Sequence, residues 1–303
     1  MSVINQKRVA YLYWAVTLGT VRAAADKFDV APSAVSRQIA LLEQELASTL
    51  IERHRKGVKV TPAGEVVLRH YRESLAHQED CLAKLSSLRG LHSGEIKLAV
   101  GEGFVGDLMS DPLPSFHRSY PNLQVSISMG GSREVLSQIE EDQAHIGLLF
   151  HPPDHPKIRT HTSQPHPLCL IVPPGHALLQ REGPVSFEEA VAFPCALQES
   201  HFGVRQLLAM AEFEQRIRLD PIVVTNSIAV MKHFVRANMG VTYLPEFVVA
   251  REVDDAQLAA IEIAHPLLSA GQAQIITRLG RQLPPGPAAL LQHLTAWMRA
   301  FNA

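Results

Sequence analysis

The first sixty residues contain four segments in an order that few folds can accommodate. Apolar residues at helical spacing predict an amphipathic helix over residues 5–17, which Gly19 ends and after which Thr20 caps an alanine-rich second helix. A third helix over residues 32–47 begins with a proline, which suits a first helical turn. Two short strands around a basic glycine turn follow. A small helical domain with a solvated basic turn is the plainer interpretation, but the order of the four segments favours a winged helix-turn-helix that binds double-stranded DNA.

The third helix divides into an apolar stripe and a polar beginning. Val35, Ile39 and Leu42 recur on one face, which we expect to be buried. A recognition helix contacts bases mainly through its N-terminal residues, and the basic turn between the strands can straddle phosphates. The predicted DNA contacts are Arg22, Ser33, Ser36, Arg37 and Gln38 in the helices, and Arg53, Arg55 and Lys56 in the wing.

Charge is distributed unevenly along the chain. The net charge of −2 for 303 residues would by itself argue against a partner made of nucleic acid. Residues 1–60, however, hold nine basic and five acidic side chains, a balance of +4. Residues 61–303 hold the other 28 − 9 = 19 basic and 30 − 5 = 25 acidic side chains, a balance of −6. A polyanionic partner is therefore expected for the beginning of the chain only.

Together these residues resemble the N-terminal signature of LysR-type transcriptional regulators. The likeness covers the stretch TVRAAADKFDVAPSAVSRQIALLEQEL and, after a short interval, LIERHRKGVKVTPAGE. Three positions depart from the family pattern: Ala47 and Ile51 stand where glycine and phenylalanine are usual, and Ala31-Pro32 stands where Ser-Gln is common. The resemblance implies a ligand-responsive DNA-binding regulator that assembles as a homodimer or homotetramer, with RNA polymerase as a further partner.

The segment from Pro62 to about residue 90 predicts one long helix. Leu68, Leu75 and Leu82 recur every seven residues, with Tyr71 interleaved among them. Such a heptad pattern indicates either a coiled-coil-like dimer or one helix packed on its own domain. The family resemblance favours the dimer.

Residues 91–303 show strands alternating with helices, which predicts a mostly parallel sheet. The segments GEIKLAVGEG, YPNLQVSISMGG and NMGVTYLP carry a weaker likeness to the family's two-lobed α/β effector-binding domain, similar in turn to periplasmic binding proteins. His145 departs from the aspartate that is usual there. The expected lobes are residues 91–163 with 269–303, and residues 164–268.

Ligands of open parallel sheets bind beyond the carboxyl ends of the strands, and four predicted loops have that position. Ser132 and Ser227 each lie at the beginning of a helix, where a hydroxyl and backbone N–H groups can hold an anion; ordinary N-capping is the simpler alternative. Arg133 and Arg205 could neutralise a carboxylate, so an organic anion is one expected class of effector. The predicted effector-binding residues are Gly103, Phe104, Val105, Gly131, Ser132, Arg133, His201, Phe202, Asn226 and Ser227.

Four other functions compete with this one. A metal sensor would use the histidines at 151, 155, 161 and 166, but four prolines prevent one helix from aligning them. A thiol sensor would use a cysteine near residue 200, where the chain reads ESHFGVR. A dinucleotide-dependent enzyme would use the loop in which Gly101, Gly103 and Gly106 match the bare glycine spacing, although no acidic partner for the ribose follows. A cytoplasmic solute-binding module is the remaining alternative.

The sequence therefore predicts three parts: a DNA-binding domain over residues 1–61, a linker helix over 62–90, and an effector-binding domain over 91–303. We expect no enzyme activity, no cofactor and no metal. Neither a long apolar run nor a signal-peptide pattern occurs, so we expect a cytoplasmic protein without a membrane partner.

Overall fold

A computed structural model describes residues 4–54, 57–88 and 94–302 of the chain. The chain divides into two compact units, Met1–Leu82 and Ala83–Ala303. No described helix is long and apolar enough to cross a membrane.

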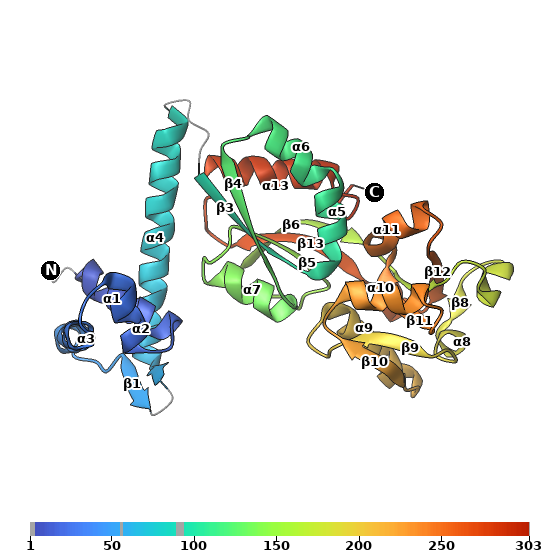
Figure 1. Ribbon diagram of the computed structural model, residues 1–303, viewed down its shortest axis with the longest axis horizontal. Helices are drawn as coiled ribbons and strands as arrows, with labels where there is room; N and C mark the ends of the chain where they lie inside the picture. Colours follow the sequence, from blue (N-terminus) through green and yellow to red (C-terminus); the bar gives the residue numbers. More distant parts are fainter. Residues whose placement is uncertain (1–3, 55–56, 89–93, 303) are drawn as a thin grey trace. The chain divides into compact units, whose positions relative to one another are not determined.

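The first unit is a three-helix core followed by a hairpin and a long helix (Figure 1). Leu12, Ala24, Ile39 and Leu42 from the three helices are fully buried against one another, which confirms the predicted apolar stripes. The elements are α1 (Gln6–Thr17), α2 (Val21–Phe28), α3 (Pro32–Glu45), β1 (Ile51–His54), β2 (Gly57–Val60) and α4 (Pro62–Leu88).

Two glycines allow the hairpin and α4 to pack tightly in this unit. The N–H of Val58 donates to the carbonyl oxygen of Gly19 at 2.9 Å, which ties the hairpin to the turn between α1 and α2. A Cβ atom on Gly57 would lie 2.4 Å from that same oxygen, and one on Gly64 would lie 2.1 Å from the carbonyl oxygen of Leu50. Both positions therefore require glycine.

The predicted heptad positions of α4 fall into two groups. Leu68 and Tyr71 are buried in the core of the first unit, and Leu75 packs partly against it. Leu82 and Leu85, by contrast, are 65% and 49% exposed. One face of the beginning of the helix is thus docked on its own domain, while Val66 in its first turns and Leu82 and Leu85 in its later turns are exposed.

The second unit contains two mixed sheets flanked by helices (Figure 1). The first sheet has the order β4-β3-β5-β13-β6, with α13 against β3 on one side and α7 against β5 on the other. Its strands are β3 (Gly94–Val100), β4 (Leu123–Met129), β5 (Ile146–Phe150), β6 (Ile158–Pro165) and β13 (Gln272–Arg278); its helices include α5 (Val105–Ser110), α6 (Pro112–Ser119), α7 (Ser132–Glu140) and α13 (Pro285–Trp297), with the short η1 (Glu102–Phe104).

The second sheet has the order β10-β9-β11-β7-β12-β8. Its strands are β7 (Leu168–Val172), β8 (Val185–Ser186), β9 (Cys195–Gln198), β10 (Pro221–Thr225), β11 (Val241–Pro245) and β12 (Ala259–Ala264), and its helices are η2 (Ala177–Gln180), α8 (Phe187–Ala190), α9 (Gly203–Gln215), α10 (Ile228–Arg236), α11 (Glu246–Asp254) and α12 (Pro266–Ser269). The chain crosses between the two sheets twice, from β6 to β7 and from β12 to β13.

Both sheets are mostly parallel, as predicted, and each contains one reversed strand: β13 runs antiparallel to β5 and β6, and β7 runs antiparallel to β11 and β12. The helices α5 and α6 are separate, since Asp111 has a non-helical backbone before Pro112. The strands β6, β8 and β9 were not predicted from the sequence.

His145 occupies the position where the family usually has aspartate, and it is a buried hydrogen-bond acceptor. The imidazole Nδ1 of His145 accepts the backbone N–H of Lys97 at 2.9 Å. The backbone N–H of His145 donates to the carbonyl oxygen of Lys97 at 2.8 Å. Burial, reinforced by the nearby charges of Arg281 and Lys97, lowers the pKa of His145 to about 3. The neutral imidazole is thus the form that the fold selects.

Candidate DNA-binding and effector-binding sites

The outer face of α3 presents four side chains in a row. Ser33, Arg37, Ala40 and Gln44 are exposed at helical spacing, opposite the buried stripe. Of the predicted contacts on this helix, Ser33 and Arg37 lie on this face, and Ser36 is half-buried beside it. The sequence prediction missed Gln44, because it placed base contacts only at the beginning of the helix.

Gln38 is turned toward α1 rather than outward. Its Oε1 accepts from Arg8 Nε at 3.1 Å, and the same guanidinium pairs with Glu45. These two contacts join the middle and the C-terminal end of α3 to α1. Gln38 consequently contributes to the packing of the three helices, whatever part it takes in contacting DNA.

The wing is held at its base by a carboxylate. Oε1 of Glu43 accepts the N–H groups of Leu50 and Ile51 at 2.8 and 3.3 Å, which fixes β1 to α3. Arg53 lies on β1 opposite Val58, and Lys59 on β2 and Arg22 on α2 are exposed. The predicted wing contacts Arg55 and Lys56 lie outside the described residues.

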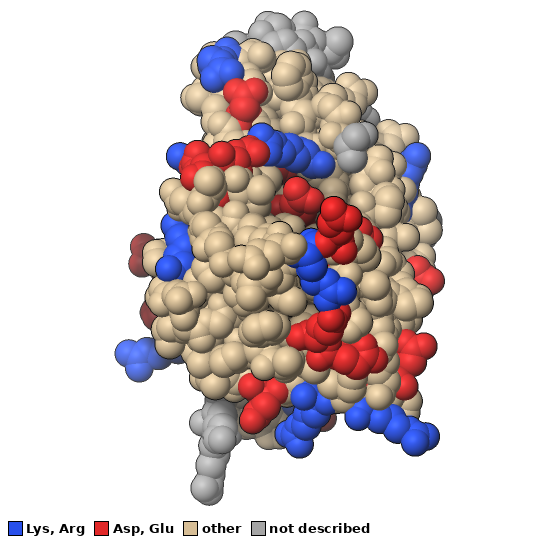
Figure 2. Space-filling model, turned by 90° about the vertical axis from the view of Figure 1, so that its right-hand side faces the viewer, with Lys and Arg blue, Asp and Glu red and all other residues tan. Residues whose placement is uncertain are grey.

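The second unit carries no comparable surface on the face shown in Figure 2. Among the residues described there, acidic and basic side chains are intermixed, and no continuous basic area forms. Charge therefore does not point to a nucleic-acid surface on this face.

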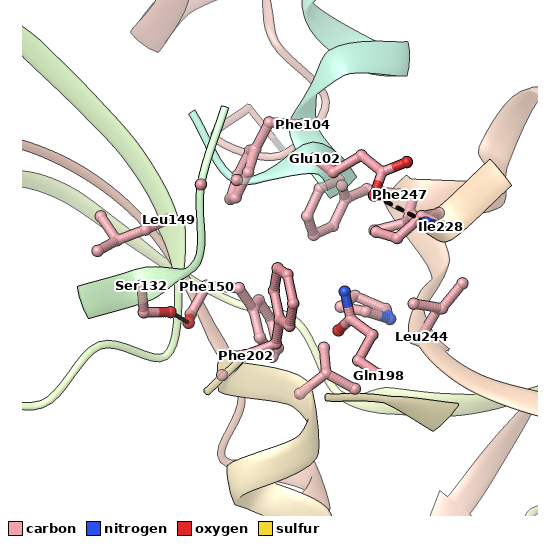
Figure 3. A pocket seen from close by; sticks show the side chains of 17 residues that line it. Glu102, Phe104, Ser132, Leu149, Phe150, Gln198, Phe202, Ile228, Leu244 and Phe247 are labelled. Atoms are coloured by element: carbon pink, nitrogen blue, oxygen red, sulfur yellow. Dashed lines mark hydrogen bonds between the residues drawn. The ribbon is translucent and has the colours of Figure 1, made fainter. Parts of the chain in front are cut away.

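A small cavity of about 40 Å³ lies where the loops after six strands meet (Figure 3). The strands β3, β4 and β5 belong to one sheet, and β9, β10 and β11 to the other. Most of its wall is apolar and aromatic. The lining residues with side chains are Glu102, Phe104, Ser132, Leu149, Phe150, Gln198, Phe202, Val204, Ile228, Leu244, Pro245, Phe247 and Val248.

Glycines let the loops of the two sheets approach closely around this cavity. A Cβ atom on Gly203 would lie 2.2 Å from the carbonyl oxygen of Phe150, and one on Gly131 would lie 2.6 Å from Cδ2 of His201. Any side chain at these two positions would push the sheets apart.

The carboxylate of Glu102 lies at the N-terminus of α10 (Figure 3). It accepts the N–H of Ile228 at 2.8 Å, the N–H of Ala229 at 3.4 Å and the hydroxyl of Ser227 at 3.2 Å. A helix N-terminus stabilises negative charge through its unpaired N–H groups and its dipole. A carboxylate from the first sheet thus caps a helix that packs on the second.

The predicted effector residues fall into three groups. Gly103, Phe104, Ser132 and Phe202 line the cavity, with the Ser132 hydroxyl donating to the Phe150 carbonyl oxygen at 3.4 Å. An adjoining open groove of about 480 Å³ is lined by Gly131, His201, Asn226 and Ser227, together with Glu102, Met129, Gly130, Glu134 and Phe202.

The two arginines and Val105 line neither space. Arg133 is exposed on α7, and Val105 packs against the core. Arg205 pairs with Glu212 on its own helix at 2.5 Å. Arg205 therefore has a carboxylate partner on its own helix and lies outside the lining of both spaces.

Sequence reasoning included Glu102 and Gln198 only as members of two candidate loops, residues 101–105 and 198–203, and named neither as an effector contact. Glu102 lies in the first of these loops, and its partners lie more than a hundred residues later. Gln198 ends β9, a strand that was not predicted. A polar residue at the carboxyl end of that strand would have identified it.

The histidines of residues 151–166 do not come together. His155 lies 3.4 Å from a carboxylate oxygen of Glu140, whereas His161 contacts the hydroxyl of Thr277 at 2.8 Å and His166 the carbonyl oxygen of Ala300 at 2.9 Å. Within the described ranges, no three His, Cys, Asp or Glu side chains are grouped as a metal site requires.

The two cysteines of the second unit are buried thiols. Burial raises the pKa of Cys169 to about 12 and that of Cys195 to about 11. Because the thiolate is the reactive form, neither is activated for oxidation.

Comparison with known proteins agrees with this geometry. Residues 7–65 match the model of bacterial regulatory helix-turn-helix proteins of the lysR family, and residues 89–299 match the LysR substrate binding domain. The chain is 25% identical to the HTH-type transcriptional activator CmpR of Synechocystis over 250 residues, which covers 81% of this chain and 80% of CmpR.

Solved structures share the fold over nearly the whole chain. A full-length variant of OxyR from Pseudomonas aeruginosa aligns with a TM-score of 0.73 and 16% identity, covering 99% of this chain and 97% of that one. CbnR in complex with its target DNA aligns with a TM-score of 0.53 and 21% identity, covering 95% and 98%. Both family models, which together span most of the sequence, lead to one conclusion: the chain belongs to the LysR family of transcriptional regulators.

Proposed function

We propose that α3 reads DNA through Ser33 and Arg37 while the second unit senses a small molecule in the cavity ringed by the two sheets. The observation that carries the DNA-binding role is the exposed polar face of α3, set opposite a fully buried stripe. Arg37 can form two hydrogen bonds to a guanine edge, and the basic wing supplies phosphate contacts. Ser36, Gln38, Arg22, Arg53, Arg55 and Lys56 complete the proposed surface.

A substitution of Arg37 tests the DNA-binding role. A DNA fragment is first selected from a random pool with the full chain, and its affinity is measured over a range of salt concentrations. Arg37→Ala should weaken binding about 10- to 100-fold, which corresponds to roughly 1–3 kcal/mol. The matched control is Arg251→Ala, an exposed arginine of α11 that should leave affinity unchanged. Equal affinity of the Arg37→Ala variant and the unaltered chain would reject the proposed surface.

We further propose that two copies pair through the later turns of α4. Leu82 and Leu85 expose apolar surface there, whereas the earlier heptad residues are occupied within their own domain. A dimer, alone or within a tetramer, would place two α3 helices on a pseudo-palindromic site. Leu82→Asp with Leu85→Asp should halve the mass measured by light scattering, and Val66→Asp is the exposed control on the same helix. An unchanged mass would show that the pairing surface lies elsewhere.

The effector role follows from the position of the cavity, because ligands of such sheets bind at the carboxyl ends of strands. Among its lining residues are Gly103, Phe104, Ser132 and Phe202, which we retain as effector contacts. An organic anion would need a basic partner, and the described residues that line the cavity include no lysine or arginine.

We propose a cytoplasmic, regulatory and non-catalytic role, in which effector binding changes how the DNA-bound protein meets RNA polymerase. The apolar cavity wall supports a binding rather than a catalytic function. No observation favours the metal or thiol alternatives: the described histidines are dispersed, and burial raises the pKa values of Cys169 and Cys195.

A further inference from the structure

We propose that the effector is an uncharged, largely apolar molecule with one hydrogen-bonding group, and that Glu102 keeps organic anions out by filling the anion position at α10. This inference rests on the proposed effector role of the cavity. It concerns the chemical class of the ligand and the residues that select it.

The charge around the cavity disfavours an anionic ligand beside α10. Of the described residues that line it, only Glu102 is charged, and its carboxylate already takes two backbone N–H groups and a hydroxyl at the N-terminus of α10. The adjoining groove adds Glu134 and His201, and His201 lies 3.5 Å from the carboxylate of Glu199. A second carboxylate brought to α10 would be repelled by Glu102 and would find the N-terminus of this helix already occupied.

Gln198 supplies a polar group that the protein itself does not use. Its side chain is only 5% exposed and points into the cavity (Figure 3). Among the described residues no hydrogen-bond partner of its amide is found, and its amide atoms are not fully enclosed by protein, so they face the space of the cavity. An amide both donates and accepts, so it can pair with a hydroxyl, carbonyl or amide of a ligand.

The rest of the wall favours an aromatic or other apolar body. Phe104, Phe150, Phe202 and Phe247 contribute four rings, and Leu149, Ile228 and Leu244 fill the spaces between them. The cavity of about 40 Å³ has room for no more than a few water molecules, whereas the groove beside it holds about 480 Å³. Phe202 lines both spaces, so a ligand that enters from the groove displaces its ring.

Chemical rescue tests whether Glu102 fills an anion site. In the full chain, Glu102→Ala should lower the melting temperature, and sodium formate should restore it relative to sodium chloride at equal ionic strength. The unaltered chain and the control Glu262→Ala, an exposed carboxylate on β12, should respond alike to the two salts. Identical responses to formate and chloride in Glu102→Ala would overturn the assignment of an anion position.

A matched series of benzene derivatives tests the ligand class. Benzyl alcohol, benzylamine and benzoate are titrated into the full chain by calorimetry. Benzyl alcohol should bind at least about tenfold more tightly than either charged compound, and Glu102→Ala should strengthen benzoate binding by about tenfold. Gln198→Leu should weaken benzyl alcohol by about tenfold while leaving toluene within about twofold.

Preferential binding of benzoate or benzylamine to the unaltered chain would overturn the proposal, as would the absence of binding by all three compounds. The same preparations are tested for salt-dependent DNA binding. If DNA binding persists while the series fails, only the ligand class is rejected; loss of DNA binding as well would reject the regulatory function itself.

Discussion

The two binding regions of this molecule treat their own functional groups in opposite ways. On α3, Ser33 and Arg37 are exposed, and the stripe behind them is buried. In the cavity of the second unit, Glu102 is already bound to α10, and the ring of Phe202 forms part of the wall. The proposed DNA-binding surface is thus exposed to its partner, whereas the proposed effector site is partly filled by the protein's own side chains.

The largest expected effect is the loss of stability that follows when one closely packed glycine is replaced in either unit. Gly64→Ala and Gly203→Ala each place a methyl group about 2 Å from a carbonyl oxygen, that of Leu50 and that of Phe150. Each should lower the free energy of unfolding of its own unit by about 3 kcal/mol or more. Hydrogen exchange should show lost protection in residues 4–88 for the first variant and in 94–302 for the second.

The matched control is Gly106→Ala on α5, where the added methyl group meets nothing within 4 Å. Alanine is the better helix former, so this variant should be stabilised by roughly 0.5–1 kcal/mol. Loss of protection in both units from one glycine substitution would mean that the regions do not unfold independently, and the comparison would fail.

A smaller effect belongs to the second unit alone and depends on pH. Because the pKa of His145 is about 3 in the fold and roughly 6.5 in the unfolded chain, the unfolded state binds the proton between these values. The stability is therefore complete above about pH 6.5 and falls as the pH drops, by about 2 kcal/mol at pH 5.

Urea unfolding at pH 7 and pH 5 measures this dependence. His145→Asn retains a hydrogen-bond acceptor for Lys97 and should lose about 2 kcal/mol less between the two pH values than the unaltered chain. His117→Asn, which removes an exposed histidine, serves as the control. An equal pH dependence in all three proteins would contradict the buried neutral imidazole.

The smallest effect belongs to the first unit. Ala47 adopts a φ of +47°, a left-handed conformation that favours glycine. Ala47→Gly should therefore raise the stability of this unit by about 1 kcal/mol. Ala40→Gly, in the exposed middle of α3, should lower it by a similar amount. Equal signs for the two substitutions in thermal unfolding would argue against backbone strain at Ala47.

The two units also differ in how much of their structure could be predicted from the sequence. The first unit follows from local spacing, because α1, α2 and α3 pack on neighbours in the chain, and the predicted helices and hairpin are confirmed. Most strands of the second unit were also predicted, as short apolar runs between turns. The strand β6 was missed because much of it is exposed and polar, so it lacks the alternation that marks a half-buried strand.

The effector site was predicted only in part, since its parts are distant in sequence. Ser132 and Ser227 were considered either as anion-binding groups or as ordinary N-caps. The Ser132 hydroxyl donates to the carbonyl oxygen of Phe150, and the Ser227 hydroxyl donates to the carboxylate of Glu102 of the same chain. No local pattern could show that Glu102 reaches α10, because the contact exists only once the two sheets are folded.

The carboxylate of Glu102 has a further consequence, because it is tethered to the helix that it caps. A tethered group competes with free solutes at an effective concentration on the order of millimolar or higher, whatever the cell contains. A free acid that binds these N–H groups no more tightly than Glu102 does would displace it only at a comparable concentration. In the effector role that we propose for the cavity, this tether shields the resting state from ordinary changes in the pool of cellular anions.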